Sequence, residues 1–219
     1  MLSDEVYTAI LDKILLEELQ PGEFINRRDL AKDLNVSVAP VLEAFKKLEQ
    51  EGFLYSVPRK GTVIRDMTWQ ELKGHLIMRE AIETAALEHI SKQTILKHKD
   101  RLLQTTLSMA KSNVDYRTTW WADLDFHKEL VSLAGLEILT QEFSRIALPC
   151  LLYFIKIHRD NTIGSYISSR PKDYTVNHEG YLQTVLGENK LLAKYEIRSH
   201  IWTTWRMVTD KLNVQEVLL

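Results

Sequence analysis

Cysteine is almost missing from this chain of 219 residues, since Cys150 is the only one. An internal disulfide framework is therefore excluded, which is typical of proteins that work in a reducing compartment. No apolar run approaches the roughly 20 residues that a membrane-spanning helix needs. Residues 1–10 (MLSDEVYTAI) also lack the basic and then apolar segments of a signal peptide. From these absences we expect a cytoplasmic protein that has no membrane partner.

An excess of positive charge is also missing. The chain has 28 basic and 30 acidic side chains, a formal net charge of −2. Residues 1–66 hold nine basic and twelve acidic side chains, a net charge of −3. If this part binds nucleic acid, its cations must gather on one face, because contacts with phosphates supply much of the affinity.

Residues 1–66 show a pattern of helices followed by two short strands. We expect helices at 4–19, 27–34 and 38–51, and strands at 53–57 and 62–65. Asn26 and Ser37 are suitable N-caps for the second and third helices. Pro40 falls in a first helical turn, where its missing N–H would have had no partner anyway. Residues 58–61 make a turn between the strands with Gly61 at its tip, so the order is that of a winged helix-turn-helix.

The rest of the chain has no convincing strand pattern. We expect helices at 69–91, 94–112, 116–134, 137–158, 175–186 and 190–212. Residues 159–174 are polar and contain Gly, Pro and Ser, which indicates a loop. The predicted fold class is mostly α, with a winged helix-turn-helix domain at 1–66 and an all-α helical bundle at 67–219.

The first domain resembles the GntR family of bacterial transcriptional regulators. The matching residues are Pro21-Gly22, Leu30-Ala31, Val36-Ser37, Pro40-Val41, Glu43-Ala44, Leu48, Glu51-Gly52 and Gly61. The second domain is similar to the FCD-type (FadR-like) effector domain in its six-helix version. That similarity rests on Arg79, Glu83, the segment 123–135 (DLDFHKELVSLAG) and two distant histidines. The resemblance implies a homodimer that binds a double-stranded DNA operator and responds to a small organic acid.

The helix that would read DNA departs from the family pattern. Val38 and Leu42 stand where the family usually has basic residues that reach bases and phosphates. An apolar side chain at these positions can only contact a thymine methyl or support packing. The DNA contacts that we expect are Arg28, Ser37, Ala39, Pro40, Lys46, Arg59, Lys60 and Gly61. A winged helix whose DNA binding is weakened stays an open alternative.

One carboxylate and three imidazoles form a candidate metal site. Asp123 and His127 are four residues apart and share a helical face. His178 and His200 are 22 residues apart, and the segment 187–189 (GEN) breaks the helix midway between them. If the chain folds back at this break into two antiparallel helices, both histidines lie at the same height along the pair. The set suits a divalent ion such as Zn²⁺, Ni²⁺ or Mn²⁺, and it matches the metal ligands of FCD domains residue by residue.

Four protein ligands leave a coordination position for a small carboxylate. Arg79 offers this effector a bidentate partner, and the alternative is an ion pair with Glu83, one turn away. The same metal could activate water in an enzyme, for which Glu129 or Glu179 would be the base. Asp125 is a rival metal ligand that we expect to face elsewhere. We expect a regulator and not an enzyme, because a winged helix has no role in the enzyme.

Overall fold

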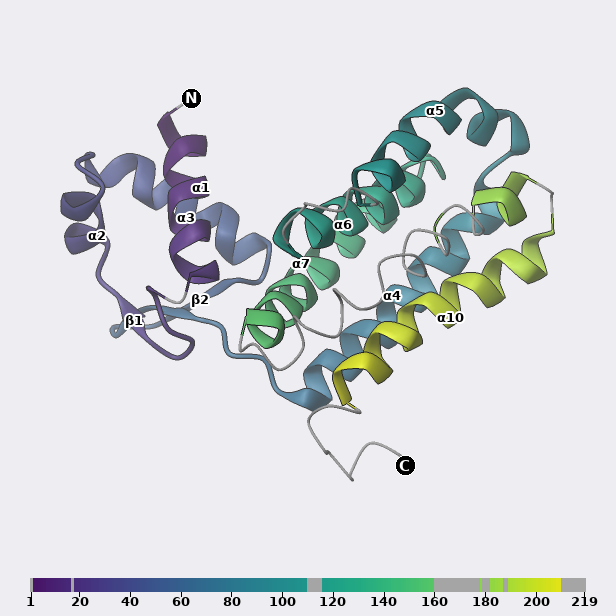
Figure 1. Cartoon of the computed structure of the whole chain (residues 1–219). Helices are drawn as coiled ribbons and strands as arrows, with labels where there is room; N and C mark the ends of the chain where they lie inside the picture. The colour runs from purple at the N-terminus through teal and green to yellow at the C-terminus, as the bar shows by residue number, and fades with distance from the viewer. Residues whose placement is uncertain are drawn as a thin grey trace. The chain divides into compact units, whose positions relative to one another are not determined.

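The computed structural model describes residues 2–16, 18–109, 116–159, 178, 182–186 and 189–209. The chain divides into two compact units, Met1–Glu71 and Leu72–Leu219 (Figure 1). None of the helices that the described residues form has the length and apolar character that crossing a membrane requires.

The first unit is a winged helix-turn-helix, as predicted. Its elements are α1 (Leu2–Leu15), β1 (Phe24–Ile25), α2 (Arg27–Asp33), α3 (Val38–Gln50), β2 (Leu54–Val57) and β3 (Gly61–Ile64). The strands form an antiparallel sheet in the order β1-β3-β2. Strand β1 was not predicted, because its two residues become a strand only by pairing with β3. Helix α1 ends at Leu15, before the predicted end at residue 19.

The core of this unit lies between α1 and α3. Ile10, Val41 and Leu48 have no exposed surface, and they lie on the helix faces that the apolar spacing predicts. The side chain of Asn26 caps α2 by accepting a hydrogen bond from the Arg28 backbone N–H at 2.9 Å. Ser37 has the extended backbone of an N-cap, but its side chain makes no capping hydrogen bond in the described part of the chain.

The second unit is helical in all of its described residues. The helices are α4 (Trp69–His89, which begins at the end of the first unit), α5 (Lys92–Met109), α6 (Tyr116–Ser132), α7 (Glu137–Arg159) and α10 (Lys190–Thr209). Their starts lie within two residues of the predicted ones. Of the helix predicted at 175–186, only residues 178 and 182–186 are described, and they are helical. Most of the loop predicted at 159–174 lies outside the described residues.

Helices α4 and α10 lie side by side in this unit (Figure 1). Trp202 Nε1 in α10 donates a hydrogen bond to Glu80 of α4 at 2.7 Å, and Lys194 forms an ion pair with Glu88. Helix α6 packs against both α5 and α7. Its buried side carries Phe126, which has no exposed surface, and this packing directs the neighbouring polar side chains of α6 into the bundle.

Candidate functional site

Four polar side chains meet in the interior of the second unit. Asp123 and His127 come from α6, and His200 comes from α10. These three and His178 are between 1% and 6% exposed. Each offers one ligand atom, and the four atoms all lie within 4.8 Å of one another. The structure thus brings together the residues that the spacing singled out, and this buried cluster could hold a metal ion.

Asp123 Oδ1 is the centre of the cluster. The Nε2 atoms of His178 and His200 lie 3.0 and 3.2 Å from it. Nε2 of His127 lies 3.7 Å from the same oxygen and 3.2 Å from Nε2 of His178. Ligand atoms about 2.1 Å from one ion are roughly 3 to 4 Å apart, so these separations fit a shared ion after small adjustments.

Two residues of α4 support the cluster from outside. Glu83, 1% exposed, lies 2.6 Å from His127 Nδ1 through one oxygen and accepts from Arg79 Nε at 2.7 Å through the other. Arg79 Nη2 also lies 3.4 Å from Asp123 Oδ2. Because an ionised Glu83 can only accept, Nδ1 of His127 is the donor and the lone pair on Nε2 faces the cluster.

Burial and the neighbouring charged groups together set the protonation states of His127, His200 and Glu83. Burial lowers the pKa of His127, and it lowers that of His200 to about 3, an effect that the charge of His178 reinforces. Burial by itself would raise the pKa of Glu83, but interactions with His127 and Arg79 outweigh it and bring the value to about 2. At neutral pH Glu83 is therefore ionised and these imidazoles are neutral, which is the form in which histidine binds metal.

The other candidates of the sequence lie elsewhere. Asp125 is exposed, as expected for a residue that faces away from His127. Glu129 forms an ion pair with Arg101, whose Nη2 lies 2.8 Å from its carboxylate, so it pairs with α5 and is not placed as a base for the cluster. Glu179 lies outside the described residues. For Arg79 the structure shows the ion pair with Glu83, and its role as an effector ligand stays a prediction.

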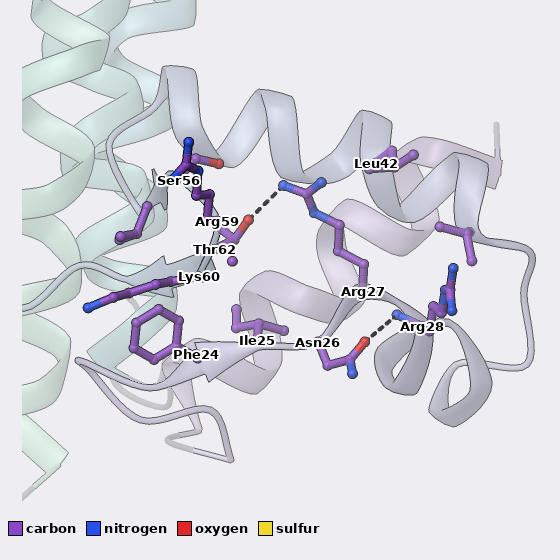
Figure 2. Close-up of a pocket in the computed structure, with 13 residues that line it drawn as sticks. Phe24, Ile25, Asn26, Arg27, Arg28, Leu42, Ser56, Arg59, Lys60 and Thr62 are labelled. Carbon is purple, nitrogen blue, oxygen red and sulfur yellow. Dashed lines mark hydrogen bonds between the residues drawn. The ribbon is translucent and has the colours of Figure 1, made fainter.

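A second candidate site is a hollow of about 790 Å³ in the first unit, between the wing and helices α2 and α3 (Figure 2). Its lining includes four cations, Arg27, Arg28, Arg59 and Lys60, and none of its thirteen lining residues is acidic. This concentration of positive charge is the arrangement that DNA binding requires of a domain with a net negative charge.

The predicted DNA contacts divide into three groups. Arg28, Arg59, Lys60 and Gly61 line the hollow. Ser37, Ala39 and Lys46 are exposed but do not line it. A side-chain contact from Pro40 does not fit the structure, because Pro40 is buried and packs the first turn of α3.

Sequence reasoning missed the structural part that Arg27 plays in this hollow. Its Nη2 donates to Thr62 Oγ1 in β3 at 2.8 Å (Figure 2). Its guanidinium also lies 5.6 Å from the centre of the Phe45 ring in α3. Arg27 thereby links α2, α3 and the wing. The turn of the wing also differs from expectation: Arg59, with φ of 64°, takes the left-handed conformation, and Gly61 already belongs to β3.

Comparison with known proteins points to one family for the first unit. Residues 2–64 match the gntR family of bacterial regulatory proteins. An uncharacterized HTH-type transcriptional regulator in an unstable DNA locus of Streptomyces ambofaciens is 21% identical over 197 residues, which cover 90% of this chain and 80% of that protein. The HTH-type transcriptional repressor RspR of Escherichia coli K12 is 23% identical over 141 residues, which cover 63% of this chain and 61% of that protein.

The whole fold also has a counterpart among solved structures. A GntR transcriptional regulator from Rhodococcus sp. RHA1 superposes with a TM-score of 0.72 at 18% identity, covering 98% of this chain and 99% of that one. At this identity the likeness is one of fold: an N-terminal winged helix-turn-helix followed by a helical domain.

Proposed function

The chain belongs to the GntR family of bacterial transcriptional regulators and has a helical C-terminal domain, and from this premise we propose that it binds a double-stranded DNA operator in the cytoplasm as a homodimer. The relatives named above are transcriptional regulators, not enzymes. In this proposal residues 1–66 bind DNA and residues 67–219 bind the effector. The observation that carries it is the hollow lined by four cations and no acid.

Fluorescence anisotropy with DNA from upstream of the protein's own gene tests operator binding. Arg59→Ala combined with Lys60→Ala should weaken binding roughly tenfold. It should also lower the slope of log affinity against log salt concentration by about 2, because each lost phosphate contact removes about one unit of slope. Lys32→Ala is the matched control, since Lys32 is exposed in the same domain and does not line the hollow. If the protein bound no DNA specifically, with or without metal, the alternative of a winged helix with weakened DNA binding would be favoured.

An exposed apolar pair on α4 supports the proposal of a homodimer. Ile77 and Met78 are each 50% exposed, and we propose that they contribute to an association patch, because contiguous exposed apolar surface marks association sites. A two-fold dimer would place two reading helices on two half-sites of the operator. Analytical ultracentrifugation of Met78→Glu should then show a shift toward monomer, and an unchanged dimer would exclude this face.

The second part of the proposal is that the four clustered residues hold one divalent metal, Zn²⁺, Ni²⁺ or Mn²⁺. When bound, this ion supplies a Lewis-acidic position to which a small organic acid can bind. Arg79, 3.4 Å from Asp123, is the cation that would stabilise the acid's carboxylate. The acid changes operator affinity if it binds more tightly to one arrangement of the DNA-binding domains than to another.

Metal content after dialysis against each ion, measured by plasma mass spectrometry, tests the metal site. Wild type should retain about one ion per chain and His178→Ala much less, because removing a ligand opens the cluster. His89→Ala, an exposed histidine at the end of α4, should behave as wild type. A panel of small carboxylates in a thermal-shift assay on metal-loaded protein then identifies the effector class, with His178→Ala as the negative control.

A further inference from the structure

We infer that α3 recognises thymine methyl groups through the side chains of Val38 and Leu42. The operator would then carry thymines at the base pairs that lie between the phosphates bound by the cations of the hollow. This inference rests on the proposed binding of DNA. It concerns the chemistry of the base pairs that are recognised.

The two side chains point away from the core of the domain. Val38 is 37% exposed and Leu42 is 36% exposed, and both line the hollow. They are four residues apart and therefore share one face of α3. The packing face of α3 is separate: Val41 is fully buried and Phe45 is 1% exposed. An apolar residue at these positions can either support packing or contact a thymine methyl. Since the opposite face of α3 already packs the core, contact with thymine is the role left for Val38 and Leu42.

The arrangement of charge around this pair matches a DNA groove. Arg28 on α2 and Arg59 and Lys60 on the wing line the same hollow as the apolar pair (Figure 2). A duplex presents the complementary arrangement, with base edges in the centre of the groove and phosphates along both rims. A protein helix could fill a hollow of this size, but it would need acidic side chains around an apolar stripe. The charge favours DNA.

The groups that each base presents in the groove determine which bases Val38 and Leu42 can contact favourably. In the major groove thymine is the base that presents a methyl group, whereas guanine presents two acceptors that Arg or Lys usually satisfies. Val38 and Leu42 can satisfy neither acceptor, and covering an acceptor without a partner is unfavourable. The pair therefore favours thymine by contact and disfavours guanine by desolvation.

Replacing single thymines by deoxyuridine tests this reading, because the change removes only the methyl group. The full chain is first used to select bound duplexes from a random library. Deoxyuridine at a contacted position should weaken wild-type binding about fourfold, the effect expected for one buried methyl. The same replacement should have little effect in Val38→Ala or in Leu42→Ala. Leu16→Ala, an exposed leucine outside the hollow at 44% exposure, should keep the full effect.

The possible outcomes distinguish a failure of thymine recognition from a failure of operator binding. Specific binding that tolerates deoxyuridine at every position overturns thymine reading and leaves operator binding intact. A methyl effect that persists unchanged in both Val38→Ala and Leu42→Ala overturns the assignment to these residues. No sequence-specific binding by wild type overturns operator binding itself. Both variants alter exposed side chains, and circular dichroism confirms that they fold.

Discussion

Glu83 accepts a hydrogen bond from Nδ1 of His127 at 2.6 Å, on the opposite side of the imidazole ring from the cluster of Asp123, His178 and His200. The contact joins α4 to α6 and fixes which ring nitrogen carries the proton. Interactions with His127 and with Arg79, whose Nε lies 2.7 Å from Glu83, lower the pKa of this buried carboxylate and keep it ionised. The lone pair of His127 Nε2 is thus directed into the cluster before any metal binds.

The first prediction follows from this contact. Glu83→Gln keeps the shape of the side chain but removes its charge, so the ring of His127 loses a strong acceptor. Metal affinity should fall about 10- to 100-fold, as is usual when a partner of a metal-binding histidine is lost. Competition with a chromophoric chelator measures this. Glu88→Gln, on the exposed side of α4, is the control, and an affinity for Glu83→Gln within twofold of wild type would contradict the positioning role.

The second prediction concerns the pH dependence of stability without metal. The pKa values of His127 and His200 are lowered in the folded protein, to about 3 for His200. Below pH 6.5 the unfolded chain therefore takes up protons that the folded one does not, and stability is lost as the pH falls. The pKa of Glu83, lowered to about 2, acts in the same direction below about pH 4.5.

Urea unfolding at pH 7, 6 and 5 in the presence of a chelator measures this loss. Each imidazole that is protonated only on unfolding contributes a slope of about 1.4 kcal/mol per pH unit. His200→Asn should reduce the slope by about that amount, and His89→Asn, at an exposed position, should leave it unchanged. A slope that is equal in wild type and His200→Asn would show that His200 titrates normally in the folded state.

Local sequence signals explain why so much of this structure could be predicted. The helix starts follow from caps and apolar spacing, as at Asn26 and Ser37, which lie one residue before α2 and α3. The grouping of Asp123, His127, His178 and His200 was predicted from the separation of four residues in α6, from the helix break expected between His178 and His200, and from the resemblance to FCD domains.

Contacts between distant residues explain what could not be predicted. Glu83 and His127 are 44 residues apart, and Arg27 and Thr62 are 35 apart. Nothing in the local spacing brings either pair together, since each contact depends on how two elements pack. Strand β1 is a similar case, because two residues acquire strand geometry only from their partner β3. The left-handed conformation of Arg59 was not predicted, because Gly61, which also has a positive φ of 127°, is the more usual residue for such a backbone.

The third prediction separates stability from DNA binding at this turn. Arg59 has φ of 64°, a conformation that costs a residue with a side chain about 1 to 2 kcal/mol. Arg59→Gly removes that cost and also the cation at the end of the wing. The variant should unfold at the same or a higher urea concentration and yet bind DNA more weakly. Arg59→Asn, which also tolerates this conformation, should behave alike. Undiminished DNA affinity in both would exclude Arg59 as a contact.

The fourth prediction concerns the link between the wing and the helices. Thr62 is fully buried and accepts from Arg27 at 2.8 Å. Thr62→Val keeps the volume and the β-branched shape but removes the acceptor. The free energy of unfolding should fall by about 0.5 to 1.5 kcal/mol, and DNA affinity should fall because the wing is held less firmly.

The salt dependence distinguishes this effect from the loss of a phosphate contact. Thr62→Val leaves every cation of the hollow in place, so the slope of log affinity against log salt should equal that of wild type while the affinity falls. Arg59→Ala should lower both the affinity and the slope, the latter by about 1. If Thr62→Val lowered the slope too, the hydrogen bond would hold Arg27 itself in contact with a phosphate, and Arg27 would have to be counted among the groups that bind DNA directly.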